Sequence, residues 1–266
     1  VYLAGQGFAV YAGLRDPDHR GALEAAAARA GARVNVVRLD LLDRASIAEA
    51  VEVVVAGSGG IFGLVNNAGI GLRGYFEDLS EAEIRQVFDV NVHGTLAVTR
   101  AALPHMRAAR QGRIIIITSV GGRIASLGLS AYCASKFAQE GFGEALAQEV
   151  EPFGIYVSLV EPAIIKTERW GINRGLAQGA LDPASPYHAW FQAAERAADR
   201  LVETSPTKPI DVARSVHTAL TAARPRLRYL VGRRAGVVMA LRRLLPGELF
   251  ERLYFGAAVR RVTRSG

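Results

Sequence analysis

Short apolar runs rich in β-branched residues alternate along the chain with longer stretches of helical periodicity. This alternation predicts a parallel sheet with helices on both faces, because strands and crossover helices follow one another in such folds. Ile114–Ile117 is apolar at every position, which predicts a central strand buried on both faces. The predicted strands are Val10–Leu14, Val34–Leu39, Gly63–Asn66, Arg113–Thr118, Ile155–Val160 and Arg228–Val231.

The predicted helices lie between and after these strands, at Gly21–Ala30, Ser46–Ala56, Ser80–Asn91, Val92–Arg110, Ala131–Phe153 and Ile210–Ala223. Two of them start with a Ser followed three residues later by a Glu, Ser46 with Glu49 and Ser80 with Glu83, which matches the capping box. No linker divides the sequence, so we expect a single domain over residues 1–266. Within it, the irregular residues 168–207 predict a substrate lid, and residues 224–266 predict a basic C-terminal extension.

Composition narrows the class of protein. Half of the 266 residues are apolar and 21% are charged, which is typical of a globular protein with a sizeable core. No apolar run approaches the ~20 residues of a membrane-spanning helix. The single cysteine, Cys133, excludes an internal disulfide, so a cytoplasmic location is expected.

The net charge of +7 comes from the C-terminal part of the chain, where residues 224–266 hold eleven Arg and two Glu. This basic tail is compatible with a peripheral contact with an anionic membrane, and residues 237–245 fit a surface helix. Aromatic residues are not interleaved there as stacking platforms, so no nucleic acid partner is expected.

Gly69-Ile-Gly71-Leu-Arg-Gly74 matches the glycine pattern of a dinucleotide-binding loop and follows a predicted strand. In such a loop the last glycine lies in the first turn of a helix, whose N-terminus holds the pyrophosphate. Here the next helix cap is Ser80, six residues later. The segment is therefore not expected to be a phosphate loop.

Tyr132 and Lys136 stand four positions apart on a predicted helix. Such positions share one helix face, so the phenol and the ammonium can project together toward the sheet edge, where Ser119 follows the Ile-rich strand. A Tyr phenol has an ordinary pKa of about 10, and a neighbouring cation favours its phenolate. The pair predicts an acid–base site, although this spacing alone is common on amphipathic helices.

Further motifs accompany this pair: Asp40 at a strand end, Asn66-Asn-Ala-Gly69, Asn91 within Phe88-Asp-Val-Asn-Val-His-Gly94, and Glu161-Pro-Ala-Ile-Ile-Lys-Thr167. In order and spacing, the set resembles the short-chain dehydrogenase/reductase family over essentially the whole chain. Residues 92–107 and 140–167 are most similar to the branch that acts on retinoid- or steroid-like alcohols and ketones. The resemblance implies an α/β fold with a Rossmann-type, doubly wound parallel sheet.

The resemblance also implies catalytic roles. Tyr132 would protonate a carbonyl oxygen or deprotonate an alcohol, Ser119 would orient that oxygen, and Lys136 would lower the pKa of Tyr132 and bind the nicotinamide ribose. Asn91 would hold a water molecule in a proton relay behind Lys136. Hydride transfer itself would belong to the nicotinamide. The histidines have no partners at metal-ligand spacing, so no metal is expected.

Cofactor contacts are implied for Asp40 and Leu41 at the adenine, for Asn67, Ala68 and Gly69 near the adenosine ribose, and for Pro162, Ala163, Ile165 and Thr167 at the carboxamide. Ala163 replaces the glycine usual in the family, which implies an altered approach to the nicotinamide. Arg15 follows the strand at which an acidic residue would bind a ribose 2′-hydroxyl, whereas an arginine can pair with a 2′-phosphate. NADP is therefore expected in preference to NAD.

In the family, a strand and a Gly-rich turn come before the segment that Val1-Tyr-Leu-Ala matches, and both are missing from this sequence. That strand would lie between Val10–Leu14 and Gly63–Asn66. We therefore expect these two strands to be separated, and the chain as it stands to bind dinucleotide poorly.

The favoured function is an NADP-dependent oxidoreductase that interconverts a secondary alcohol and a ketone, or a primary alcohol and an aldehyde, on an apolar small molecule. Two alternatives stay open: a dinucleotide-binding sensor without turnover, and an inactive fragment of such an enzyme. Sensors of this kind commonly lose the tyrosine or the lysine, and this chain retains Tyr132 and Lys136. A homo-oligomer is a further expectation.

Overall fold

The computed structural model describes residues 1–167 and 175–263, except for the side chains of Arg233, Arg234 and Arg261. In these residues the strands form two parallel sheets, one ordered β2-β1 and the other β3-β4-β5-β6. The strands are β1 (Val10–Leu14), β2 (Val34–Arg38), β3 (Gly63–Asn66), β4 (Gly112–Ile117), β5 (Ile155–Pro162) and β6 (Arg228–Val231). The α/β fold with parallel strands is thus confirmed.

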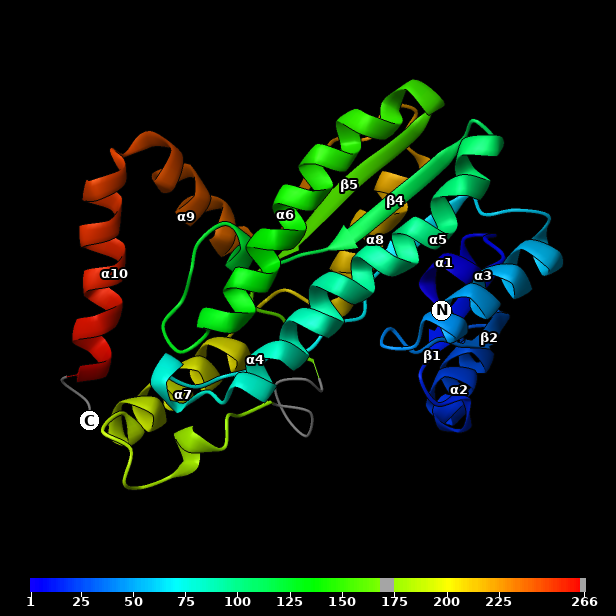
Figure 1. Cartoon of the computed structure of the whole chain (residues 1–266). Coiled ribbons are helices and arrows are strands. Elements are labelled where there is room, and N and C mark those ends of the chain that lie inside the picture. The colour runs from blue at the N-terminus through cyan, green and yellow to red at the C-terminus, as the bar shows by residue number, and fades with distance from the viewer. Residues whose placement is uncertain (168–174, 264–266) are drawn as a thin grey trace.

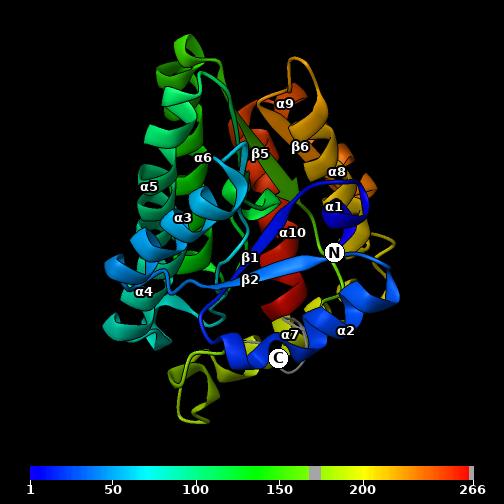
Figure 2. The same ribbon diagram turned by 90° about the vertical axis from the view of Figure 1, so that its right-hand side faces the viewer.

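Helices cover both faces of the larger sheet, as α5 and α6 pack on one face and α8 on the other (Figures 1 and 2). The described helices are α1 (Tyr2–Gly5), α2 (Gly21–Arg29), α3 (Arg44–Ser58), α4 (Glu81–Phe88), α5 (Thr95–Ala108), α6 (Ser130–Val150), α7 (His188–Glu203), α8 (Pro209–Thr221), α9 (Arg233–Leu244) and α10 (Gly247–Thr263). This arrangement confirms the doubly wound architecture.

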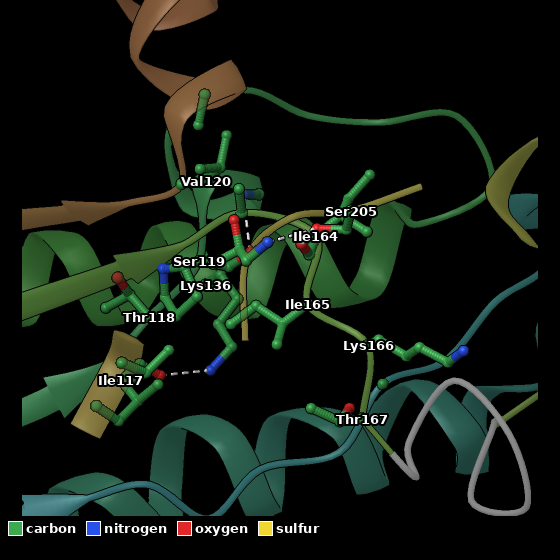
Figure 3. A pocket seen from close by; sticks show the side chains of 18 of the residues that line it. Ile117, Thr118, Ser119, Val120, Lys136, Ile164, Ile165, Lys166, Thr167 and Ser205 are labelled. Atoms are coloured by element: carbon green, nitrogen blue, oxygen red, sulfur yellow. Dashed lines mark hydrogen bonds between the residues drawn. The ribbon is translucent and has the colours of Figure 1, made fainter. Parts of the chain in front are cut away.

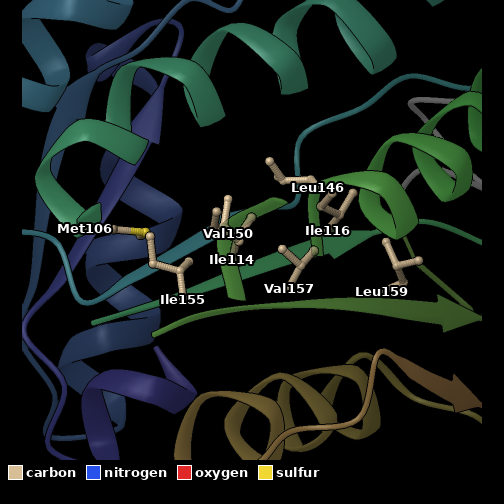
Figure 4. Packing of buried hydrophobic residues seen from close by; sticks show 8 residues of the cluster. All are labelled: Met106, Ile114, Ile116, Leu146, Val150, Ile155, Val157 and Leu159. Atoms are coloured by element: carbon tan, nitrogen blue, oxygen red, sulfur yellow. The ribbon is translucent and has the colours of Figure 1, made fainter. Parts of the chain in front are cut away.

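The isoleucines of β4 supply the centre of the core. Ile114 and Ile116 pack with residues of α5, α6 and β5, as Figure 4 shows, while Ile115 joins a second cluster with α8 on the opposite face. All three side chains are fully buried. Burial of each contributes about 1.5–3 kcal/mol. Because successive strand residues point to opposite faces, a strand covered on both sides must be apolar throughout.

β1 and β3 belong to different sheets, which confirms that Val10–Leu14 and Gly63–Asn66 are not paired. β1 pairs with β2 along its whole length, from Val10 opposite Val34 to Leu14 opposite Arg38. Figure 1 shows this small sheet beside α1 and α2, to one side of β4 and β5.

One of the two predicted capping boxes is wrong. Ser80 and Glu83 form the expected box at the start of α4. In contrast, α3 begins two residues before Ser46, and Asp43 is its N-cap, because the Asp43 carboxylate accepts hydrogen bonds from the amides of Ala45 and Ser46. The Ser46 hydroxyl instead accepts a hydrogen bond from the amide of Asp40.

The segment that was predicted to be an irregular lid contains a long helix, α7. It buries Phe191, Ala193 and Val202. Residues 168–174 of the predicted lid lie outside the described residues. α10 stands apart from the larger sheet and contacts α7 (Figure 1). Across the described residues, we find no helix with the length and apolar character needed to cross a membrane.

Candidate active site

A cavity of about 1760 Å³ lies at the carboxyl ends of β3, β4 and β5. Ligands of open α/β sheets bind at this edge. The cavity brings together nine of the predicted site residues: Asn67, Gly69, Ser119, Tyr132, Lys136, Pro162, Ala163, Ile165 and Thr167. They come from the segments after β3 and β4, from the end of β5 and the segment that follows it, and from α6.

Tyr132 and Lys136 lie on adjacent turns of α6 and face the same cavity, as their spacing predicted. Lys136 Nζ lies 5.9 Å from the centre of the Tyr132 ring. The lysine is only 4% exposed, and its ammonium donates a 2.9 Å hydrogen bond to the carbonyl oxygen of Ile117 in β4 (Figure 3). A buried cation is thereby held beside the phenol.

Ser119 follows β4 in an extended conformation, and its Oγ accepts a 3.0 Å hydrogen bond from the amide of Gly121. Gly121 lies between the two candidate catalytic hydroxyl residues: a Cβ there would lie 3.3 Å from Ser119 Oγ and 3.4 Å from Tyr132 Cε1. Sequence reasoning missed Gly121, since its importance depends on the approach of β4 to α6. The neighbouring Cys133 is buried, and this burial raises the pKa of its thiol.

Asn91 does not line the cavity but lies behind Gly69, fully buried in a π-helix (Asp89–Gly94) that joins α4 to α5. Its side-chain Oδ1 accepts a 2.7 Å hydrogen bond from the backbone N–H of Ile70, and its Nδ2 donates a 2.9 Å hydrogen bond to the Ile70 carbonyl oxygen. It also donates to Ser135 Oγ at 3.0 Å. The sequence analysis placed Asn91 where one predicted helix ends and the next begins. It did not predict Ser135 as a hydrogen-bond partner of Asn91.

The segment after β5 forms the opposite wall, where Thr167 and Ile165 lie across from Lys136 in Figure 3. Ser205 Oγ donates a 2.5 Å hydrogen bond to the carbonyl of Ile164 and ties this wall to the segment after α7. Ala163 is half-buried, and its amide donates to the carbonyl of Val231.

Four predicted cofactor residues do not line the cavity: Arg15, Asp40, Leu41 and Ala68. Arg15 is exposed after β1. Asp40 Oδ1 accepts a hydrogen bond from the amide of Leu42, and Leu41 packs in a cluster around Ile47. Their contacts with a cofactor stay predictions.

The glycine pattern from Gly69 to Gly74 enters no helix, as expected, because α4 begins only after Ser80. The amide of Gly74 instead donates to the carbonyl of Gly128, and Arg73 pairs with Leu176 in a β-bridge. The described residues contain no group of three or more His, Cys, Asp or Glu side chains arranged to hold a metal ion.

Residues 1–174 match the family model of short chain dehydrogenases. Retinol dehydrogenase 8 from Bos taurus is 36% identical over 252 residues, which cover 93% of this chain and 80% of the relative. 17-beta-hydroxysteroid dehydrogenase type 1 from Homo sapiens is 38% identical over 234 residues, which cover 86% and 70%.

Solved structures show the same fold. A short-chain dehydrogenase/reductase from Burkholderia phymatum in complex with NAD has a TM-score of 0.74 and 25% identity, covering 89% of this chain and 83% of that chain. A metagenomic short-chain oxidoreductase in complex with NADP has a TM-score of 0.66 and 27% identity, covering 86% and 87%. The chain belongs to the short-chain dehydrogenase/reductase family. It is an oxidoreductase whose relatives include retinol and steroid dehydrogenases.

Proposed function

We propose that this protein is an NADP-dependent oxidoreductase that interconverts a secondary alcohol and a ketone, or a primary alcohol and an aldehyde, on an apolar small molecule. The observation that carries this proposal is the meeting of Ser119, Tyr132 and Lys136 at one cavity. Much of the remaining wall is apolar, with Ile124, Leu127, Leu129, Leu201, Val238 and Val262 among its residues. Retinol and steroid dehydrogenases among the relatives support an apolar substrate.

The three side chains can perform the proton chemistry of such a reaction. Because Ser119 Oγ accepts the Gly121 amide, its own O–H is able to donate to the substrate oxygen. Tyr132 gives its proton to that oxygen in reduction and takes it back in oxidation. The Lys136 ammonium, held by the Ile117 carbonyl, favours the phenolate that forms.

The residues around Lys136 fit a nicotinamide ribose. A Cβ on Gly69 would lie 3.0 Å from Asn91 Oδ1 and 3.7 Å from Lys136 Nζ, so only glycine leaves this approach to the ammonium open. Pro162, Ala163, Ile165 and Thr167 would hold the nicotinamide on the other wall. A nicotinamide held there would supply or accept the hydride. The choice of NADP rests on Arg15, the first residue after β1.

A substrate panel tests the proposal. Retinol, a 17β-hydroxysteroid and their carbonyl counterparts are offered with each nicotinamide cofactor, and turnover is followed by NADPH or NADH absorbance. Tyr132→Phe is expected to abolish turnover and to leave NADPH affinity nearly unchanged, since only the hydroxyl serves the substrate oxygen. Lys136→Ala is expected to lower both turnover and NADPH affinity.

Tyr156→Phe is the matched control, because it removes a hydroxyl from β5 at a residue that does not line the cavity. It should keep full turnover. A Tyr132→Phe protein that retains more than a few per cent of wild-type turnover would show that the acid–base assignment is wrong.

We also propose a cytoplasmic location with a peripheral membrane contact through α9 and α10. Both helices present exposed leucines beside exposed arginines, which supports binding to an anionic lipid surface.

A further inference from the structure

Gln139 lies on α6 one turn after Lys136 and is fully buried. Its side-chain Oε1 accepts a 2.8 Å hydrogen bond from Lys136 Nζ. Its Nε2 donates to the backbone carbonyl of Asn91 at 2.6 Å and to Thr95 Oγ1 at 2.9 Å. One side-chain amide thus joins the ammonium on α6 to the π-helix 48 residues earlier in the chain.

The chemistry of its partners fixes the orientation of this amide. An ammonium can only donate and a backbone carbonyl can only accept, so Oε1 must face Lys136 and Nε2 must face Asn91. Thr95 donates its hydroxyl hydrogen to the same Asn91 carbonyl at 2.8 Å, which leaves its oxygen free to accept from Nε2. Both amide hydrogens and the amide oxygen of Gln139 therefore have partners.

We propose that Gln139 is the positioning residue of Lys136, and that its amide performs the connection to Asn91 for which the family resemblance implies a water molecule. With contacts of 2.8 and 2.6 Å, the amide fills the path between Lys136 Nζ and the Asn91 carbonyl. A water molecule can reverse the direction of its hydrogen bonds, whereas this amide presents only an acceptor to Lys136. It therefore stabilises the ammonium in one place, beside Tyr132 and the proposed ribose site.

The inference concerns the same site as the proposed function and partly rests on it, so one readout is chosen that needs neither cofactor nor substrate. The chain contains three lysines, Lys136, Lys166 and Lys208. In protein labelled with ¹³C at lysine, the Lys136 signal is assigned by its loss in Lys136→Arg, and its pKa is read from a pH titration.

Two substitutions should move the pKa of Lys136 in opposite directions. Gln139→Met keeps the length of the side chain but removes the acceptor, so the buried ammonium is less stable and its pKa falls. Gln139→Glu keeps an acceptor and adds a negative charge, so the pKa rises. A residue with only a packing role would not produce opposite shifts.

Gln148→Met is the matched control, since Gln148 lies on the exposed part of the same helix and donates to the Glu144 carbonyl. Gln148→Met should leave the pKa of Lys136 unchanged. The other ionisable groups on the surrounding elements include Tyr132, Cys133 and Glu140 on α6, Asp89 and His93 on the π-helix, and Glu161 on β5. Glu140 and Glu161 pair with Arg228. Repeating the titrations with Tyr132→Phe separates the phenol from the lysine.

Turnover provides the second readout. On the best substrate of the panel, Gln139→Met should lower kcat roughly ten- to a hundredfold, the effect of losing one hydrogen bond to a charged group. Unchanged Lys136 titration in both variants, or shifts in the same direction, would overturn the inference. If wild-type protein turns over no substrate, the proposed function fails, while the titration still decides the role of Gln139. If Gln139→Met does not fold, Gln139→Leu takes its place, and the pKa of Lys136 should fall in that variant for the same reason.

Discussion

Ala163 and Gly232 lie close together on the cavity wall that is proposed to hold the cofactor. Ala163 stands where the resemblance implies a glycine, and a Cβ on Gly232 would lie only 2.8 Å from the Ala163 Cβ. Gly232 also has a φ of +129°, a conformation that residues with a side chain rarely adopt. The methyl group of Ala163 therefore occupies space that Gly232, between β6 and α9, leaves open.

The proposed preference for NADP is tested at the scale of one residue. Arg15 is exposed directly after β1, where it can pair with a 2′-phosphate. A charge-assisted hydrogen bond of this kind contributes about 1.5–3 kcal/mol, so Arg15→Ala should weaken NADPH binding roughly ten- to a hundredfold and leave NADH binding almost unchanged. Nucleotide fluorescence titrations measure both affinities.

Arg20→Ala controls for the loss of positive charge, because Arg20 is exposed nearby and pairs with Glu24. Arg20→Ala should change the affinities for NADPH and NADH only slightly and to the same extent. Equal losses of NADPH and NADH affinity in Arg15→Ala would contradict the preference for NADP.

At the scale of elements, the carboxyl end of β5 carries a buried charge cluster beside the cavity wall. Glu161 has a side chain only 3% exposed and pairs with Arg123 at 3.0 Å and with Arg228 at 3.4 Å. Arg228 also contacts Glu140 at 3.1 Å, which links β6 to α6. Burial, followed by the nearby charge of Glu140, raises the pKa of Glu161 above its ordinary value of 4.5 despite the arginines.

This shift predicts a pH dependence of stability. A carboxyl group whose pKa is raised by folding binds more protons in the folded state, so the free energy of unfolding falls as pH rises from 4.5 through the raised pKa. Glu161→Gln removes this titration. The free energy of unfolding of the variant, relative to wild type, should therefore increase over that pH interval and stay constant above it.

Urea unfolding at a series of pH values measures the effect. Glu144→Gln is the control, because Glu144 pairs with the same Arg228 but is 57% exposed. The difference in free energy of unfolding between Glu144→Gln and wild type should vary little with pH. A relative stability of Glu161→Gln that falls with rising pH would show that the arginines outweigh the burial.

At the scale of the whole molecule, α9 and α10 extend the fold beyond the sheet and give it an apolar, cationic surface. Leu244 is 78% exposed and Leu253 is 54% exposed. The exposed arginines on these helices are Arg242, Arg243, Arg252 and Arg260. α10 also lines the cavity with Tyr254, Ala258 and Val262, so the same helix borders the site and the surface.

This surface predicts binding to anionic membranes. The protein should sediment with phosphatidylserine vesicles and much less with phosphatidylcholine vesicles, and salt should weaken the binding. Leu244→Ser with Leu253→Ser should lower the binding roughly tenfold or more, since each leucine loses its transfer into the lipid.

Leu42→Ser is the control, as Leu42 is 57% exposed but lies in the segment after β2. It should leave vesicle binding unchanged. Equal binding to both kinds of vesicle, or no effect of the double substitution, would exclude this membrane contact.

The sequence by itself determined the features that depend on neighbouring residues. β1, β3 and β6 lie where the apolar runs predicted, and the shared face of Tyr132 and Lys136 follows from helix geometry. The tertiary structure decided what depends on segments far apart in the chain. It joins Gln139 to Asn91 and brings α7 and α10 to the cavity. Periodicity reports which side of an element is apolar, whereas the packing of distant elements selects the surface that each side meets.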